Sequence, residues 1–262
     1  MTLAAGVDIG STTAKCALLE DGRVVGKSLN PVGVELVKDA ERALELALED
    51  AGRPRREIAV VTGTGYGRFK VTFGQFTVTE IGCHAKGAHH LFPATRVVLD
   101  IGGQDTKAIK VDARGEVVDF AMNDKCAAGT GRFLDVCAGA LGYDVSEIGP
   151  LSFGSRHPVR VTNTCTVFAE SEVSSYVARG KDTRDIVAGL YGGIVSRSLS
   201  LLQRVGVEPE VTFTGGVSRN EGMVRTLEQR MNLRVNVSPL SQFMGAIGAA
   251  LYGLDRIGGT PA

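Results

Sequence analysis

The chain has 262 residues, of which 44% are hydrophobic and 22% are charged, and its formal net charge is zero. This composition is typical of a globular protein that buries its core in one large or two smaller domains. The zero net charge argues against nucleic acid as the main partner, and no apolar run is long enough to span a bilayer. We therefore expect a cytoplasmic protein that binds neither nucleic acid nor a membrane.

Short β-branched runs that end in glycine alternate with helical patterns along the chain. The runs are AGVDIG from Ala5, AVVTGTG from Ala59, RVVLDIG from Arg96 and EVTFTGG from Glu210. Between the first two, apolar residues recur on one face of a predicted helix, and Gly52 followed by Pro54 ends it. This alternation of strands and helices predicts an α/β fold.

The segment that begins at Asp8 is repeated, with changes, from Asp100. DIGSTTAKCALLEDGRVV and DIGGQDTKAIKVDARGEVV match at Asp, Ile, Gly and Lys, which predicts two related lobes that face each other. The loop after each Asp-Ile-Gly offers backbone N–H groups that suit phosphate oxygens, and the two aspartates suit hydrated magnesium. The two lysines either add positive charge there or point to solvent. The candidate phosphate-binding residues are Gly10, Ser11, Thr12, Thr13, Lys15, Gly102, Gly103 and Lys107.

A third glycine-containing element, FTGGVSRNEGM from Phe213, fits a strand that passes through Gly215 and Gly216 into a helix. Close approach of its backbone would admit a nucleotide base or sugar. The chain has no P-loop pattern, which excludes that class of ATPase. The glycines at positions 63, 65 and 67 lack the full dinucleotide-binding spacing, so we interpret them as a turn.

Two cysteines lie in similar surroundings, Cys126 in NDKCAAGTGRFLDVC and Cys165 in TNTCTVFAESEV. We expect each at the start of a helix, where free N–H groups favour negative charge. Five cysteines without a secretion signal favour free, metal-bound or redox thiols over a disulfide framework. Gly129 and Gly131 weaken the first helix, which is tolerable if its backbone approaches phosphate or if the helix moves.

The remaining cysteines have simpler interpretations. Cys16 and Cys137 fit small buried apolar residues. Cys83 lies near His84, His89 and His90, which raises a zinc hypothesis, but the spacing is poor and packing or surface roles are favoured. In the second cysteine segment, the carboxylates at 170 and 172 either face a cleft or are solvated.

Several of these motifs resemble known ones. DIGSTTAK, DIGGQDTK and FTGGVSRN resemble the two phosphate motifs and the adenosine motif of the superfamily of acetate and sugar kinases, the heat-shock chaperone ATPase and actin. NDKCAAGTGRFLDV with TCTVFAESEV resembles the ATP-dependent reductive activators (component A) of 2-hydroxyacyl-CoA dehydratases, in the BadF/BadG/BcrA/BcrD-type ATPase family. More loosely, the chain is similar to the ATPase subunits of benzoyl-CoA reductases. The resemblance covers nearly the whole chain.

The resemblance implies two ribonuclease H-like lobes of the actin-like ATPase fold, with a nucleotide cleft between them. Lobe I would cover residues 1–93 and lobe II residues 94–242, while a closing helix at about 243–256 would pack back on lobe I. It also implies a homodimer that holds one four-iron four-sulfur (4Fe-4S) cluster. Cys126 and Cys165 of each subunit would supply its four thiolates.

The resemblance further implies binding of ATP or ADP with Mg²⁺. Asp8 and Asp100 would hold the magnesium through water, and Gln104 or Asp105 would position the attacking water. Other residues that it places at the nucleotide are Gly129, Gly131, Gly215, Gly216, Asn220 and Gln242. The protein would be an oxygen-sensitive component of anaerobic metabolism. It would take an electron from reduced ferredoxin or flavodoxin and deliver it, coupled to ATP hydrolysis, to a 2-hydroxyacyl-CoA dehydratase.

Three alternatives stay open. The electron acceptor could instead be benzoyl-CoA reductase or a double-cubane cluster protein. A small-molecule kinase would use the same ATP site with a general base and would not need Cys126 or Cys165. A chaperone-like or actin-like module would use the nucleotide to control binding or assembly.

Overall fold

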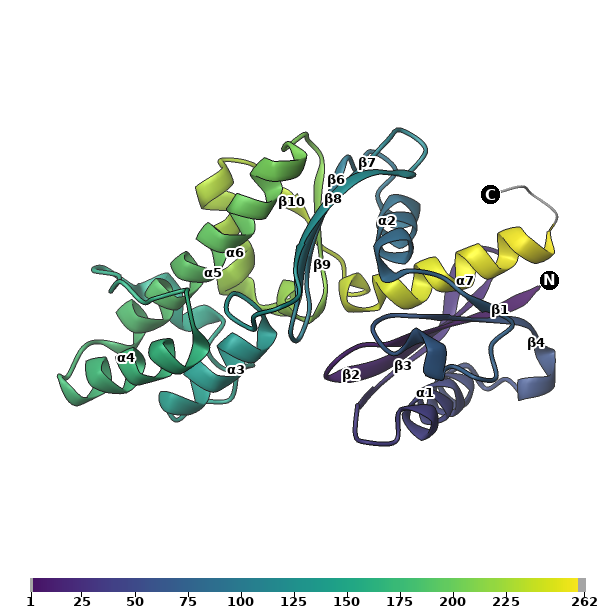
Figure 1. Ribbon diagram of the computed structural model, residues 1–262, viewed down its shortest axis with the longest axis horizontal. Coiled ribbons are helices and arrows are strands. Elements are labelled where there is room, and N and C mark those ends of the chain that lie inside the picture. The colour runs from purple at the N-terminus through teal and green to yellow at the C-terminus, as the bar shows by residue number, and fades with distance from the viewer. Residues whose placement is uncertain (1, 259–262) are drawn as a thin grey trace. The chain divides into compact units, whose positions relative to one another are not determined.

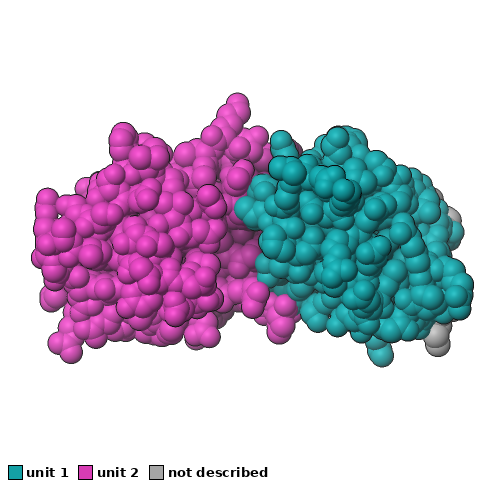
Figure 2. Space-filling model, turned by 90° about the horizontal axis from the view of Figure 1, so that it is seen from below, with its two compact units in different colours: residues 1–95, 111–118, 240–262 teal, residues 96–110, 119–239 magenta. Residues whose placement is uncertain are grey.

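The computed structural model describes residues 2–258, which fold into two compact α/β units (Figure 1). Unit 1 contains the residues up to 95, residues 111–118 and the residues from 240 onward, and unit 2 contains residues 96–110 and 119–239 (Figure 2). Each unit has its own five-stranded sheet. The boundaries of lobes I and II as independently folding domains stay a prediction.

Unit 1 is a mixed sheet with helices on both faces. Its strand order is β3-β2-β1-β4-β5, in which β1, β2 and β3 are antiparallel neighbours and β4 runs parallel to both β1 and β5. Its elements are β1 (Leu3–Ile9), β2 (Thr13–Glu20), β3 (Arg23–Pro31), α1 (Leu36–Ala51), β4 (Ile58–Thr64), β5 (Phe76–Thr77), α2 (Glu80–Leu91) and α7 (Met244–Ile257), with short 3₁₀ turns at Arg55–Glu57, Arg68–Lys70 and Ser241–Phe243.

The alternation of side chains along β1 decides which helix covers which face. Ala5 and Val7 pack in the cluster formed with α1, whereas Ala4 packs in the cluster formed with Ala246 of α7. Gly6 lies on the α7 face, and a side chain there would overlap the backbone of α7. Asp8 follows on that same face, so its carboxylate ends near the start of α7. Helix α1 ends as predicted, with Gly52 at a φ of 62°.

Unit 2 repeats the topology of unit 1. Its strand order is β10-β9-β6-β7-β8, in which β6 and β7 form an antiparallel hairpin and β9 runs parallel to β6. The duplication predicted from the two Asp-Ile-Gly segments is confirmed, because each unit holds one copy of the hairpin at the same place in its sheet. The elements are β6 (Val97–Ile101), β7 (Thr106–Val111), β8 (Val117–Asn123), α3 (Gly131–Ala140), α4 (Thr166–Ala178), α5 (Thr183–Val205), β9 (Val211–Thr214), α6 (Glu221–Met231) and β10 (Val235–Asn236), with 3₁₀ turns at Pro150–Gly154 and Gly216–Arg219.

The core of unit 2 joins its sheet to α3 and α5. Phe133 and Cys137 of α3 are fully buried there, together with Ile194 of α5 and Phe213 of β9. Burial raises the pKa of the Cys137 thiol to about 12, which fits a packing residue. The prediction that Cys137 and Cys16 are small buried residues is confirmed. Across residues 2–258, every helix falls short of the length and apolarity that a membrane crossing requires.

Candidate functional site

An aspartate and a lysine pair at the same place in both sheets. The register sets Asp8 opposite Lys15 and Asp100 opposite Lys107. Lys15 Nζ donates to Asp8 Oδ2 at 3.2 Å, and Lys107 Nζ donates to Asp100 Oδ2 at 3.3 Å. Both lysine side chains are largely buried, so they do not point to solvent. Each unit therefore holds a buried ion pair at the end of the strand that leads into its candidate phosphate loop.

The two candidate phosphate loops have the same backbone turn. Gly10 N–H donates to Thr13 O at 3.1 Å, and Gly102 N–H donates to Asp105 O at 3.0 Å. Lys107 Nζ also contacts Asp105 Oδ2 at 2.7 Å, so Asp105 is held within its own loop. Gln104 is exposed and makes no side-chain hydrogen bond with the residues at 2–258. Of the two candidates for positioning water, Gln104 has the freer side chain.

A left-handed glycine lies against each of the paired aspartates. Gly65, at a φ of 89°, follows the strand residue paired with Asp8, and Gly215, at 83°, follows the one paired with Asp100. A methyl group on Gly215 would lie 2.7 Å from Asp100 Oδ1, and one on Gly65 would overlap Asp8 Oδ1. Gly65 does lie in a turn, but it is also the unit 1 counterpart of Gly215. The shared Thr-x-Thr-Gly at 62–65 and 212–215 is the sequence signal that could have shown this.

His84 and Gly245 lie beside Asp8, and sequence reasoning did not connect them with it. A side chain on Gly245 would begin 3.0 Å from Asp8 Oδ2 and 3.1 Å from His84 Nε2, so α7, α2 and β1 converge at this point. His84 is buried, with 7% of its surface exposed. In unit 2, the corresponding aspartate instead accepts a hydrogen bond from the Thr214 hydroxyl, at 2.9 Å.

The other members of the cysteine and histidine cluster point elsewhere. Cys83 is buried, and burial raises the pKa of its thiol to about 12. The rings of His89 and His90 contact the carbonyl oxygens of Ala113 and Gly22, at 3.2 and 2.7 Å. Among the described residues, no three His, Cys, Asp or Glu side chains are grouped to hold a metal ion.

Replacing Gly245 with alanine tests whether the space beside Asp8 matters. The added methyl would press on the Asp8 carboxylate, and we expect the ATP hydrolysis that the resemblance implies to fall by about tenfold or more, because small displacements of reacting groups are costly. Phosphate release under saturating ATP measures this. Gly139→Ala is the matched control, since Gly139 lies in α3 with no atom within 4 Å of the added methyl. Equal rates for both variants would contradict the expectation.

The prediction that Cys126 lies at the start of a helix is wrong. Helix α3 begins at Gly131 with Thr130 as its N-cap, because the chain first turns at 127–130 and Gly129 adopts a φ of 87°. Cys126 precedes this turn and is half-buried. Gly129 consequently lies outside the helix and does not weaken it.

The start of α3 is joined directly to the second candidate phosphate loop. Gly131 N–H donates to Gly102 O at 2.9 Å, and Arg132 N–H donates to Gly103 O at 2.8 Å. The Thr130 hydroxyl adds a bond to Gly103 O at 3.0 Å. The first N–H groups of α3 are thus used by the loop, and a shift of that loop would be transmitted to the turn that follows Cys126.

Cys165 lies where expected, as the N-cap residue of α4. It is half-buried and follows an extended segment, residues 158–164, which we call the strap. Cys126 Sγ lies 3.8 Å from Thr164 O, the residue just before Cys165. The two cysteine segments are therefore neighbours within one chain.

Arg197 of α5 contacts both cysteine segments, and sequence reasoning did not identify it. Its Nη1 donates to Asn163 O in the strap at 2.9 Å. A methyl group added to Gly129 would lie only 2.8 Å from the Arg197 Cδ, which is too close for two carbon atoms. The glycine therefore makes room for the arginine. The Arg197 Nε–H is buried and has no hydrogen-bond partner among residues 2–258.

Replacing Arg197 with methionine should loosen the two cysteine segments. We expect the free energy of unfolding to fall by about 1–3 kcal/mol, through loss of the bond to Asn163 O and of packing on Gly129. Denaturant unfolding measures the change. Arg204→Met on the exposed last turn of the same helix is the control, with an expected change within about 0.5 kcal/mol. A loss no larger than that of Arg204→Met would remove Arg197 from this bracing role.

The adenosine motif has its own local structure. Gly215 and Gly216 lead from β9 into the 3₁₀ turn, and Asn220 caps α6 by accepting from Met223 N–H at 3.0 Å. The amide group of Asn220 also donates to Tyr191 Oη at 3.0 Å, so both of its polar groups have structural partners. Gln242 lies in the 3₁₀ turn before α7, within unit 1.

The donor set for an iron-sulfur cluster is half complete in one chain. Cys126 and Cys165 are neighbours and half-buried, whereas the other three thiols are fully buried in the cores. A cubane cluster takes four thiolates. The residues present therefore fit two of the four ligands, and the remaining two would have to come from a second chain.

Comparisons with known proteins find the same family that the phosphate, adenosine and cysteine motifs resemble. The model of the BadF/BadG/BcrA/BcrD ATPase family matches residues 5–253. The (R)-2-hydroxyglutaryl-CoA dehydratase activating ATPase of Acidaminococcus fermentans is 45% identical, over 96% of both chains. One of the subunits of benzoyl-CoA reductase from Thauera aromatica is 36% identical, over 98% of this chain and 94% of the other.

A solved structure gives the same result for the fold. The activator of the 2-hydroxyisocaproyl-CoA dehydratase from Clostridium difficile, solved with bound ADPNP, superposes with a TM-score of 0.93. The two sequences are 41% identical, and the superposition covers 99% of this chain and 97% of the activator. The predicted α/β fold of the actin-like ATPase class is confirmed, while the nucleotide cleft between the lobes stays an expectation.

Proposed function

This chain belongs to the BadF/BadG/BcrA/BcrD ATPase family, and from that premise we propose that it hydrolyses ATP to deliver a low-potential electron to a 2-hydroxyacyl-CoA dehydratase. The observation that carries this proposal is the connection between the second phosphate loop and the Cys126 segment. Two backbone hydrogen bonds join Gly102 and Gly103 to the first residues of α3. Through these bonds, a change at the bound nucleotide would reach a cysteine segment by the backbone itself.

For the ATPase step, the two units would contribute equivalent groups. Asp8 and Asp100 would hold hydrated Mg²⁺, and no described side chain donates to Asp8 Oδ1, which leaves that oxygen for a metal-bound water. Lys15 and Lys107 fix the carboxylates from the neighbouring strands. The Gly10 and Gly102 N–H groups close the two loop turns, so the N–H groups of the residues within the turns, such as Gly103, would face the phosphates. Gln104 or Asp105 would orient the attacking water.

For electron transfer, we propose a homodimer in which Cys126 and Cys165 of each chain hold one 4Fe-4S cluster. When bound, the cluster supplies a site that accepts and releases one electron. Cys165 lies at the N-terminus of α4, where the backbone favours the negative charge of a thiolate-ligated cluster. Arg197 bonds to the strap and packs on the Gly129 turn, so it braces the two cysteine segments against each other.

The electron donor in this proposal is a reduced ferredoxin or flavodoxin, and the acceptor is a dehydratase with a docking surface for the dimer. Oxygen would destroy such a cluster, so an anaerobic, reducing cytoplasm is the compartment in which it would work. Benzoyl-CoA reductase is the second candidate acceptor, because its relative from Thauera aromatica matches nearly the whole chain.

The test is anaerobic reoxidation of the reduced protein, followed in the visible spectrum, in the presence of a purified 2-hydroxyacyl-CoA dehydratase. We expect reoxidation only when Mg-ATP is added, with phosphate released at the same time. Reoxidation at the same rate with ADP would contradict the coupling. Phosphate transfer to a sugar or a carboxylate, by protein that holds no iron, would replace the proposal with a kinase.

A further inference from the structure

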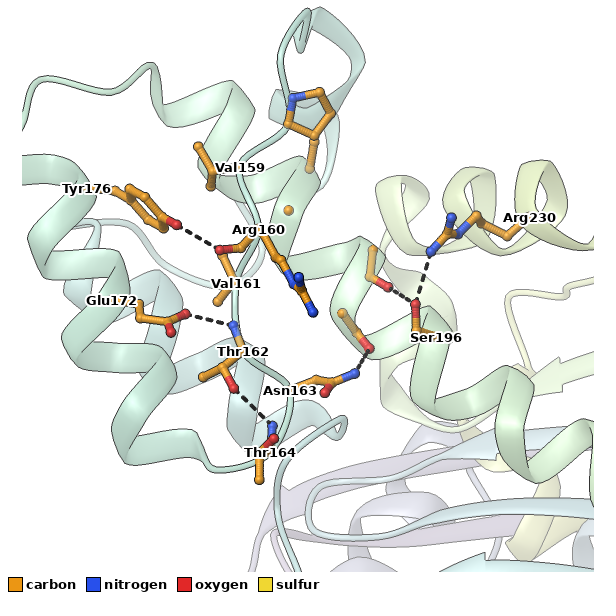
Figure 3. A pocket seen from close by; sticks show the side chains of 15 residues that line it. Val159, Arg160, Val161, Thr162, Asn163, Thr164, Glu172, Tyr176, Ser196 and Arg230 are labelled. Carbon is orange, nitrogen blue, oxygen red and sulfur yellow. Dashed lines mark hydrogen bonds between the residues drawn. The ribbon is translucent and has the colours of Figure 1, made fainter.

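A cavity of about 910 Å³ lies within unit 2, and its lining contains no residue of the second phosphate loop or of the adenosine motif (Figure 3). The strap forms one wall, and α4, α5 and α6 supply the others. Its size is within the range of small-molecule binding sites. The lining is rich in polar groups, including backbone atoms of the strap and the side chains of Thr162, Asn163 and Ser196.

Glycines on α5 create this space. At Gly189 the strap packs directly on the helix, since a side chain there would overlap the backbone of Val159. One turn further on, the position that a side chain on Gly192 would take has no described atom from outside its own helix within 4 Å. The strap thus packs closely on α5 at Gly189 and leaves a hollow over Gly192, which a larger residue would fill.

The strap is fastened along its length, so the wall of the cavity has a defined position. Tyr176 Oη donates to Arg160 O at 2.8 Å, and Thr162 N–H donates to Glu172 Oε2 at 2.7 Å. Asn163 Nδ2 donates to Gly193 O at 3.0 Å. Just before the strap, Asp185 Oδ1 accepts from the N–H of His157 at 2.9 Å.

Two arginines bring positive charge to the cavity. The side chain of Arg160 extends from the strap across the hollow, and Arg230 reaches it from α6 (Figure 3). Arg230 Nη2 donates to Ser196 Oγ at 3.0 Å, which fixes the guanidinium at the rim. Among residues 2–258, neither arginine forms an ion pair with a carboxylate. Glu172 lines the same cavity, but its Oε2 is engaged by the Thr162 backbone.

We propose that this cavity binds a small molecule that carries an anionic group, a phosphate or a carboxylate. Each guanidinium presents several N–H donors in a planar fork that matches both groups, and no described residue accepts a hydrogen bond from the Arg160 side chain. The Asn163 and Ser196 side chains and the strap backbone would meet the polar body of the ligand. The binding claim does not depend on the proposed ATPase function.

The site would act on the second cysteine segment. The strap continues through Thr164 into Cys165, so an anion that links Arg160 to Arg230 would fasten the strap to α6 as well as to α4 and α5. Ligand binding would then stabilise the segment that carries one thiol. This consequence rests on the proposed function, whereas the binding does not.

Calorimetric titration tests the site, with inorganic pyrophosphate and citrate as probes for the two kinds of anion. Saturating Mg-ADP is present throughout, so that the proposed nucleotide site does not contribute to the heat. We expect saturable binding of at least one probe, weakened by about tenfold or more in Arg160→Gln and in Arg230→Gln. Binding should also weaken as salt is raised.

Arg225→Gln is the matched control. It removes the same charge from α6, but Arg225 lies over the Phe153 ring and does not line the cavity. Unchanged secondary structure and melting temperature show that each variant is folded. Absence of binding by both probes at concentrations up to about 10 mM would overturn the proposal. Equal binding by wild type and by the Arg160→Gln, Arg230→Gln double variant would do the same.

Discussion

Replacing Cys126 with alanine is expected to remove all cluster iron while leaving a folded protein. Cys126 is half-buried beside the residue that precedes Cys165, so its loss takes one of two thiolates from each chain. A cubane left with two of its four thiolates is not held. The half-buried side chain contributes little to the core, and we expect unfolding free energy to change by about 1 kcal/mol or less. Iron analysis after anaerobic reconstitution measures the first effect.

Cys16→Ala is the matched control for this experiment. Cys16 is fully buried in β2, and burial raises the pKa of its thiol well above the usual range, which disfavours a thiolate. We expect the Cys16→Ala protein to keep its iron. Full iron retention by Cys126→Ala, or equal loss in both variants, would rule out the ligand assignment.

Replacing Asp8 with asparagine is expected to lower ATP hydrolysis by about 100-fold or more with the cluster retained. The substitution keeps the shape of the side chain but removes the charge that would hold hydrated magnesium, and such electrostatic groups carry effects of this size. Phosphate release by the reduced and the oxidised protein measures the effect, and iron content is measured in parallel.

Asp21→Asn is the control for Asp8→Asn. Asp21 lies in the turn between β2 and β3 with a φ of 50°, a conformation that asparagine adopts readily. We expect its hydrolysis rate to equal that of the wild type. Because Asp8→Asn also leaves Lys15 without its carboxylate, the melting temperature must show that the variant is folded. An unchanged hydrolysis rate in folded Asp8→Asn would remove Asp8 from the mechanism.

The sheets were predictable because their signals are local and repeated. The spacing from Asp8 to Lys15 is the same as that from Asp100 to Lys107, and in each unit the hairpin register sets the two residues opposite each other. Side-chain alternation then directs the lysine and the aspartate to the same side of the hairpin. The end of α1 at Gly52 has an equally local reason. Glycine has no side chain, so it adopts the left-handed conformation there without steric cost.

The start of α3 was not predictable in the same way. The sequence around Cys126 is compatible with a helix, but the structure uses Gly129 in a left-handed turn that makes room for Arg197. The amides of Gly131 and Arg132 then bond to a loop almost thirty residues earlier in the chain. Such contacts are set by tertiary packing, which overrides local propensity.

The neighbours of Asp8 belong to the same class of unpredictable features. His84 and Gly245 are far from Asp8 in the sequence, and they reach it only because α7 packs against β1 and α2 packs on α7. His84 looked like part of a poor zinc motif, because its neighbours in the sequence are other histidines and a cysteine. The fold separates these residues and gives His84 a different surrounding from His89 and His90.

Iron and acid-labile sulfide, measured after strictly anaerobic purification together with the mass of the assembly, test the central claim most directly. The proposed function predicts a dimer with about four iron and four sulfide ions, and a visible absorption that bleaches on reduction with dithionite. A protein that remains free of iron after anaerobic reconstitution would contradict it, as would a monomer that holds a complete cluster.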